Sequence, residues 1–132
     1  MQTMDGDKVR SGQCLCGDVR FNARGAPLWV AHCHCLSCRR NTGAPVATFV
    51  GFPEKQVTFT GNRSTFSSSP GVRRGFCGRC GTPVSYEADR FPGEIHLYIS
   101  AFENPEDLPA DRHVYSDQRI GWFQITDNLP RR

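Results

Sequence analysis

The sequence has no apolar run that approaches the ~20 residues needed to span a membrane as a helix, so no membrane partner is expected. Its first ten residues are polar and lack the apolar segment of a signal peptide. We therefore expect a cytoplasmic protein in a reducing compartment, where disulfide bonds are rare. We interpret residues 1–10 as a flexible lead-in and residues 11–132 as a single domain, because 132 residues match the usual size of one domain.

The sequence also lacks any long segment with helical periodicity. Short segments instead alternate apolar and polar residues with a period of two, most clearly at 19–23, 57–60 and 95–100, and this pattern is typical of strands. Further short strands are expected at 28–32, 46–52, 63–67, 73–76 and 84–87, with single helical turns after Cys38 and near 105–108. Many short strands separated by turns predict an all-β fold with short helical turns, built around metal.

Cysteine, in contrast, is abundant, and its count of seven is odd. The cysteines lie in three short clusters, which are Cys14 and Cys16, then Cys33, Cys35 and Cys38, then Cys77 and Cys80. Residues i and i+2 of a strand point the same way, and a C-x-x-C segment with glycine inside it forms a tight metal-binding turn. A disulfide framework with one spare thiol is the alternative, and the spacing together with the reducing compartment disfavours it.

The seven thiols divide most simply into a group of four and a group of three. Cys33, Cys35 and Cys38 lie within six residues, so they share one ion most easily. The two remaining pairs, Cys14 with Cys16 and Cys77 with Cys80, together complete a tetrahedral site of the structural type. Three protein ligands leave a fourth position for water or substrate, which is the arrangement of catalytic zinc. The sequence therefore predicts two zinc ions per chain, one structural and one catalytic.

The formal net charge of +3 counts every cysteine as neutral. Seven thiolates and two divalent ions would add −7 + 4 = −3, so the charge of the metal-loaded chain would be zero. The arginines are also dispersed and form no basic run. A nucleic-acid partner is therefore disfavoured.

The four histidines are not assigned as ligands. By strand alternation, His34 points away from the metal of Cys33 and Cys35, and His32 shares the side of His34. His96 falls on the outward face of its strand, and His113 follows in a loop-rich region where it could line a site. A histidine could still close the three-cysteine site and make it structural.

Arg39 and Arg40 follow Cys38 directly, and two interpretations of them remain open. A guanidinium pairs bidentately with a carboxylate, so these side chains could hold an anionic substrate. They could equally compensate the negative charge of a zinc–thiolate centre or face solvent. Arg39, Arg40, Thr42 and Gly43 are accordingly the candidate substrate-binding residues, on adjacency alone.

At these motifs the chain resembles the glutathione-dependent formaldehyde-activating (GFA) family. The segments that carry the resemblance are 14–17, 33–45 and 76–82, and the segments 113–115 and 127–130 also look like the C-terminal pattern of that family. Asn128 stands where the family usually has glycine. The resemblance implies a β-tent fold, shared with small zinc-binding accessory proteins of Rab nucleotide exchange, and the same division of the cysteines into structural and catalytic sets.

The resemblance also implies a reaction, the condensation of glutathione with formaldehyde to S-hydroxymethylglutathione, by a carbon–sulfur lyase. Zinc at the open site would bind the thiol and lower its pKa. The implied partners are a small thiol, glutathione first, and an aldehyde. Two alternatives remain: a non-catalytic zinc module for a protein or nucleic-acid partner, and a metal or redox sensor that uses the thiols of the open site.

Overall fold

The computed structural model describes residue 6 and residues 8–132 of the chain. Its strands are β1 (Val9–Gln13), β2 (Arg20–Arg24), β3 (Trp29–Cys33), β4 (Ala47–Pro53), β5 (Val57–Thr60), β6 (Arg63–Ser69), β7 (Val72–Cys77), β8 (Pro83–Ala88), β9 (Glu94–Tyr98) and β10 (Arg112–Val114). One α-helix, α1 (Leu36–Thr42), follows β3, and short 3-10 turns occupy Glu54–Gln56, Ile99–Ala101, Pro105–Asp107 and Ser116–Gln118. The prediction of a mainly β fold with short helical turns is confirmed.

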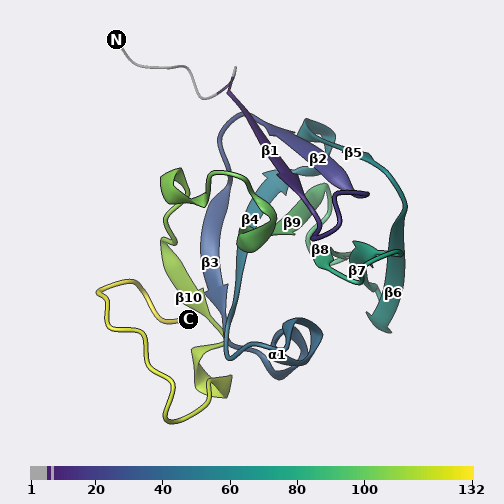
Figure 1. Ribbon diagram of the computed structural model, residues 1–132. Coiled ribbons are helices and arrows are strands. Elements are labelled where there is room, and N and C mark those ends of the chain that lie inside the picture. Colours follow the sequence, from purple (N-terminus) through teal and green to yellow (C-terminus); the bar gives the residue numbers. More distant parts are fainter. Residues whose placement is uncertain (1–5, 7) are drawn as a thin grey trace.

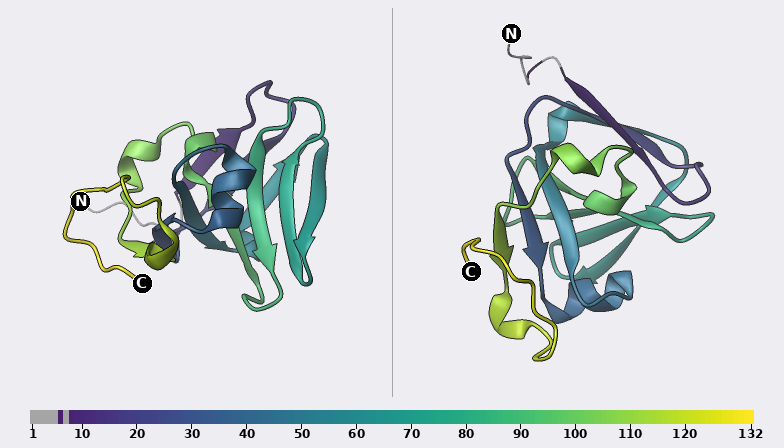
Figure 2. Two further views of the ribbon diagram at one scale, coloured as in Figure 1. Left: turned by 90° about the horizontal axis from the view of Figure 1, so that it is seen from below. Right: turned by 60° about the vertical axis from the view of Figure 1, so that its left-hand side comes forward.

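The strands form two sheets that face each other (Figures 1 and 2). A small sheet has the order β1-β2-β5, and a large sheet has the order β10-β3-β4-β9-β8-β7-β6. All neighbours pair antiparallel except β10 and β3, which run parallel, with His113 opposite His32. The C-terminal segment therefore returns to lie beside β3, as the views in Figures 1 and 2 show.

The main core lies between the small sheet and one face of the large sheet. Phe21 from β2 packs there with Val50 and Phe52 from β4 and with Ile95 and Leu97 from β9. The opposite face of the large sheet carries a second buried cluster, which includes Cys33, Cys38, Phe49, Tyr86 and Tyr98. Alternation within each strand supplies both clusters, because successive side chains point to opposite faces.

The large sheet is thus covered on both faces, and this corrects one expectation. His96 was placed on an outward face, yet it is only 6% exposed. Its strand alternates as predicted, but the rings of Trp29, Phe49, Tyr86 and Phe91 pack around His96 and bury it. Alternation identifies two sides of a strand without identifying which side meets water.

Two strands, β1 and β10, were missed, and the helix α1 differs from its predicted boundaries. β1 begins at Val9, inside the expected lead-in, because Val9–Gln13 pairs with β2 along its whole length. Most of that lead-in, residues 1–5 and 7, lies outside the described residues. α1 begins at Leu36, before Cys38, with Cys35 as its N-cap. The three-residue β10 is too short for a periodic signal, and only its parallel pairing with β3 defines it.

Candidate metal centres and the adjoining cavity

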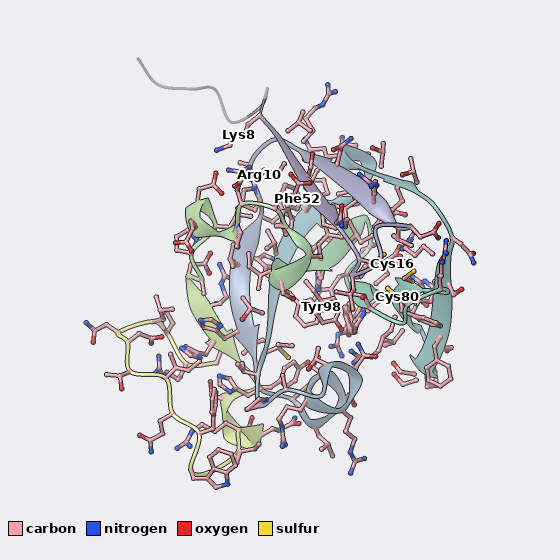
Figure 3. All side chains as sticks on the ribbon, in the orientation of Figure 1. Lys8, Arg10, Cys16, Phe52, Cys80 and Tyr98 are labelled. Carbon is pink, nitrogen blue, oxygen red and sulfur yellow. The ribbon has the colours of Figure 1, made fainter. Side chains whose placement is uncertain are left out.

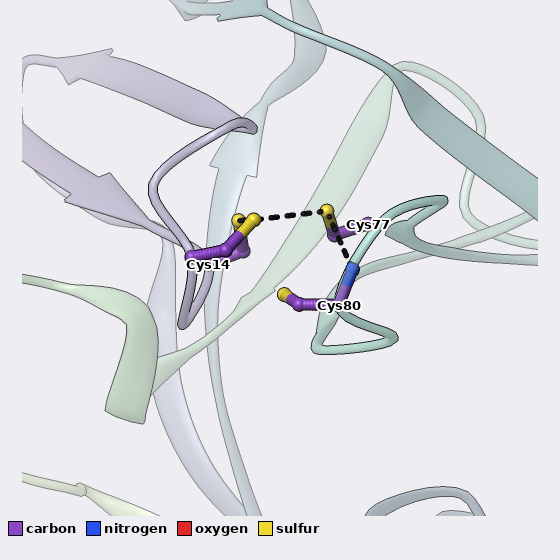
Figure 4. A group of neighbouring side chains, drawn as sticks. Cys14, Cys77 and Cys80 are labelled. Carbon is purple, nitrogen blue, oxygen red and sulfur yellow. Dashed lines mark hydrogen bonds between the residues drawn. The ribbon is translucent and has the colours of Figure 1, made fainter.

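The four cysteines expected to form one site come together at the junction of the two sheets. Cys14 and Cys16 lie in the turn after β1, Cys77 is the last residue of β7, and Cys80 lies in the turn that joins β7 to β8. The sulfur atoms of Cys14 and Cys16 are 3.7 Å apart, those of Cys16 and Cys77 are 3.8 Å apart, and all four lie within 4.8 Å of one another (Figure 4). Figure 3 shows Cys16 and Cys80 side by side at this junction. Zn–S bonds of about 2.3 Å in a tetrahedron require sulfur–sulfur edges of about 3.8 Å, so this group fits zinc.

Local backbone geometry prepares these sulfurs for a cation. The backbone N–H of Val19 donates to Cys14 Sγ at 3.3 Å, and the N–H groups of Arg79 and Cys80 both donate to Cys77 Sγ at 3.3 Å. Gly81, at φ 82°, lets the second turn close without a side chain in the left-handed region. N–H groups that point at sulfur stabilise the thiolate form, which is the form that binds metal.

The three cysteines of the second group lie where β3 passes into α1. Cys33 ends β3, Cys35 caps α1, and Cys38 lies in the first turn of α1. The sulfurs of Cys33 and Cys38 are 3.5 Å apart, and the backbone N–H of Cys38 donates to Cys35 Sγ at 3.3 Å. All three sulfurs lie within 4.8 Å, and among residues 8–132 no further cysteine, histidine or carboxylate joins them.

Crowding of the three thiols separates their proton affinities. Hydrogen bonds from Cys33 and Cys38 lower the pKa of Cys35 to about 2, whereas the same contact with Cys35 raises the pKa of Cys33. Without a metal, the three thiols therefore favour a state in which Cys35 alone is a thiolate. Three sulfurs gathered in this way form a donor set for a soft cation. The donors and spacing of this group therefore also fit zinc, with three ligands from the described chain.

A cavity of about 660 Å³ opens beside the three-cysteine group. Its wall includes Cys33, Cys35 and Cys38, and its floor is the face of the large sheet that carries the second buried cluster. An aromatic platform covers much of this floor and consists of Trp29, Phe49, Tyr86, Phe91 and His96. The rings of Trp29, Tyr86 and Phe91 lie 4.4, 5.5 and 5.2 Å from the His96 ring. Four arginines, Arg74, Arg90, Arg112 and Arg132, and the carboxylates of Glu94 and Asp117 also line the cavity.

Arg74 is one of the cavity residues that sequence reasoning missed. It is 6% exposed, and its Nη1 lies 3.7 Å from Cys38 Sγ. Its Nε donates to Ser68 Oγ at 3.0 Å, and its guanidinium lies 5.0 Å from the centre of the Tyr86 ring. A buried guanidinium against a thiol sulfur favours negative charge on that sulfur. The signal was present in the alternation of 73–76, which places Arg74 and Arg73 on opposite faces of their strand.

The four candidate substrate-binding residues lie elsewhere. Arg39, Arg40, Thr42 and Gly43 are absent from the cavity wall. Arg39 donates to the carbonyls of His34 and Gln118 at 3.2 and 3.1 Å, and Thr42 donates to the carbonyl of Cys38 at 2.8 Å. Gly43 ends α1 at φ 67°. The side chains of Arg39 and Thr42 thus bind backbone carbonyls in and around α1, and substrate binding by the four residues stays a prediction.

His34 points away from the three sulfurs, and His32 lies on the same side as His34, as strand alternation indicates. His34 is 2% exposed, and its Nε2 lies 2.8 Å from His113 Nδ1, while His113 Nε2 lies 3.0 Å from an Asp127 oxygen. His32 Nδ1 lies 2.7 Å from Thr48 Oγ1. His113, which the sequence left as a residue that could line a site, is the central member of a buried row of hydrogen-bonded side chains behind the three-cysteine group.

Fold and sites together define a β-sheet protein with two clusters of cysteines that could hold metal ions, one between the sheets and one beside a cavity. The model of the family described as "Glutathione-dependent formaldehyde-activating enzyme" matches residues 9–118, so the chain belongs to this family. The membership expected from the cysteine motifs is confirmed.

A solved structure supports the fold. It is a crystal structure of a Rhodobacter sphaeroides protein, 20% identical, which aligns with a TM-score of 0.63 over 92% of this chain and 99% of its own. At that identity the likeness shows the fold alone. None of the curated proteins matches the chain. In the part of the chain that the structure describes, no helix is long and apolar enough to cross a membrane.

Proposed function

We propose that the chain is a zinc-dependent carbon–sulfur lyase that forms and cleaves the adduct of a small thiol with an aldehyde, with glutathione and formaldehyde as the leading pair. The observation that carries this proposal is the position of Cys33, Cys35 and Cys38 in the wall of a 660 Å³ cavity. None of the four cysteines of the other group lines this cavity or the smaller cavity of about 250 Å³ beside His34 and His113. Family membership supports the same chemistry.

Cys33, Cys35 and Cys38 would hold the catalytic zinc, and Cys14, Cys16, Cys77 and Cys80 the structural zinc. Zinc held by three thiolates would take a substrate sulfur as its fourth ligand and keep it deprotonated. The chain supplies what surrounds that sulfur. The cavity wall limits its contact with water, and the aromatic platform holds the apolar parts of the substrate.

We propose that Arg74 donates a hydrogen bond to the carbonyl oxygen of the aldehyde. During addition the substrate sulfur forms a bond to the carbonyl carbon, the C=O π electrons move to oxygen, and that oxygen takes a proton from water. The guanidinium of Arg74 lies beside Cys38 Sγ and can donate to an oxygen on a carbon bonded to a sulfur held there. Fixed donors aimed at developing charge lower the barrier for such a step.

The charges around the cavity suit an anionic thiol. Arg90, Arg112 and Arg132 line its wall, against the two carboxylates of Glu94 and Asp117. A tripeptide thiol with two carboxylates and one ammonium group matches this mixture of signs. These arginines replace Arg39 and Arg40 in the proposal for carboxylate binding.

The test is the exchange of formaldehyde between its free and glutathione-bound forms, followed at chemical equilibrium by NMR exchange spectroscopy. A protein that only binds glutathione shifts the equilibrium, whereas a catalyst raises the exchange rate in proportion to its concentration. We expect proportional acceleration with the wild type and none with Cys35→Ser, which removes one ligand of the open site. Metal analysis should show that the variant keeps the ion of the four-cysteine group. Wild-type exchange no faster than that of Cys35→Ser would refute the glutathione–formaldehyde assignment.

A further inference from the structure

The loop of the three-cysteine group is held from behind by a buried chain of side chains. Asp127 accepts from His113 Nε2 at 3.0 Å, and His113 Nδ1 lies 2.8 Å from His34 Nε2. The His34 and His113 rings stack with centres 5.1 Å apart, and both residues are 2% exposed. This row of hydrogen-bonded side chains therefore runs from the C-terminal segment, through β10, to the residue between Cys33 and Cys35.

The carboxylate determines the direction of the hydrogen bonds in this chain. An ionised carboxylate only accepts, so His113 Nε2 carries a proton and donates to Asp127. A neutral His113 then has a lone pair on Nδ1, which accepts from His34 Nε2. Asp127 is held in turn by Arg131 and by the backbone N–H of Leu129 at 3.1 Å, so its oxygens have a fixed position.

Three hydrogen bonds hold His34 in place, one through its side chain and two through its backbone. Its backbone N–H donates to the Val114 carbonyl at 3.1 Å, and its own carbonyl accepts from Arg39 Nε at 3.2 Å. With Nε2 on His113, every polar group of His34 except Nδ1 has a partner, and Nδ1 is buried without one. The peptide bonds on either side of His34 lead directly to Cys33 and Cys35, so the position of His34 sets the positions of both sulfurs.

We propose that Asp127 is a positioning residue which, through His113 and His34, holds the Cys33–Cys38 loop in the geometry that binds metal. The inference rests on the metal assignment made above for these cysteines. Partners behind a metal site that orient its ligands are commonly worth 10- to 100-fold in metal affinity. Within residues 8–132, no hydrogen bond joins Asp127, His113 or His34 to the four-cysteine group, so the effect should be confined to one of the two sites.

The metal test uses the full-length chain loaded with Co²⁺, whose sulfur-to-metal charge-transfer absorption reports thiolate coordination. The difference between wild type and Cys35→Ser gives the signal of the three-cysteine site alone. We expect Asp127→Ala and His34→Leu to raise the Kd of that site by roughly tenfold or more, and the four-cysteine site to change by less than about twofold. The amide of His34→Gln can still donate to His113, so this variant should stay close to wild type. Asp89→Ala, which removes a carboxylate that pairs with the exposed Arg73, is the matched control.

Two results would overturn the proposal: an unchanged Kd of the three-cysteine site in both variants, or equal weakening of both sites, which would indicate general destabilisation. If His34→Leu does not fold, the comparison of Asp127→Ala with Asp127→Asn decides, because asparagine keeps an acceptor for His113 and should retain more of the metal affinity.

Nitrogen-15 NMR of the imidazoles gives a measurement without metal. Protons on Nε2 of both His34 and His113 in the wild type, and loss of this arrangement in Asp127→Ala, would support the proposed hydrogen bonds. A proton on His113 Nδ1 in the wild type would contradict them. If wild type takes up no Co²⁺ beyond the Cys35→Ser level, the proposed function fails. The NMR result then still tests whether Asp127 orders the hydrogen bonds of His113 and His34.

Discussion

Two adjacent arginines on β7 show how much a single position decides in this protein. Arg73 pairs with Asp89 at 3.0 Å, and its side chain is 45% exposed. Arg74 faces the cavity and is 6% exposed. Burial of a guanidinium is costly unless its donors find partners, and here Ser68 Oγ, Cys38 Sγ and the Tyr86 ring supply them. A charge held at this cost beside a thiol group is a strong candidate for function.

The pair provides a direct comparison. Arg74→Ala should slow the formaldehyde–glutathione exchange by roughly 10²-fold, as loss of one fixed donor to developing charge does in other enzymes. Arg73→Ala removes the same side chain from the exposed face and should leave the rate within about twofold, because surface ion pairs contribute little. Both rates are measured by NMR exchange at equal metal content. Equal rates in the two variants would remove Arg74 from the proposed mechanism.

At the scale of elements, β4 determines the shape of the cavity floor. Gly51 stands opposite Trp29 on β3 and opposite His96 on β9. A Cβ at Gly51 would lie 2.5 Å from Trp29 Cε2, so the absence of a side chain lets the indole lie across the strand. The edge-on contact between Trp29 and His96, with ring centres 4.4 Å apart, follows from this close approach.

Gly51→Ala should therefore displace Trp29 and destabilise the fold by about 1–3 kcal/mol through overpacking. The measurement is urea unfolding followed by fluorescence in a Trp122→Phe background, where Trp29 is the remaining tryptophan of the two in the chain. Displacement of the indole toward water should also shift its emission to longer wavelength. Gly121→Ala is the control, since no atom lies within 4 Å of the added Cβ. Equal midpoints for Gly51→Ala and Gly121→Ala would show that the platform does not need glycine at this position.

At the scale of the whole molecule, the four-cysteine group joins the two sheets. Cys14 and Cys16 follow β1 of the small sheet, and Cys77 ends β7 of the large sheet with Cys80 in the turn after it. The group packs with Val19 and Val84 in a small cluster of its own, separate from the main core. A metal ion here would cross-link segments about sixty residues apart in sequence, as the 61-residue separation of Cys16 and Cys77 shows.

Loss of this cross-link should unfold the protein. Structural zinc contributes apparent free energies of about 10–16 kcal/mol in zinc-finger peptides, which matches or exceeds the ~5–15 kcal/mol stability of a typical domain. Cys77→Ser should therefore yield unfolded or aggregated protein, whereas Cys38→Ser should stay folded and lose only the metal of the cavity site. Circular dichroism melting and metal analysis of both variants check this. Similar melting temperatures for the two would contradict the division into structural and catalytic sites.

Local patterns in the sequence were sufficient for much of this architecture. Alternation with a period of two predicted three of the strands, since side-chain direction along a strand depends only on neighbouring residues, and five further strands were expected from short segments between turns. Short cysteine spacing predicted the group of three and the two separate pairs, because residues two or three apart cannot lie far from one another. The joining of the two pairs into a group of four was inferred from the four ligands of a structural zinc site. The zinc itself, its count and the single-domain division at residue 11 stay predictions.

The tertiary structure alone decided which residues surround the open site. Arg74 reaches Cys38 across 36 residues, and Asp127 reaches His34 through His113 across the parallel pairing of β10 with β3. The burial of His96 likewise depends on rings from other strands. No local period encodes such contacts, because they arise from the order and register of strands that are distant in the chain. The sequence by itself determined where metal could bind, and the packing of the two sheets determined what lies next to it.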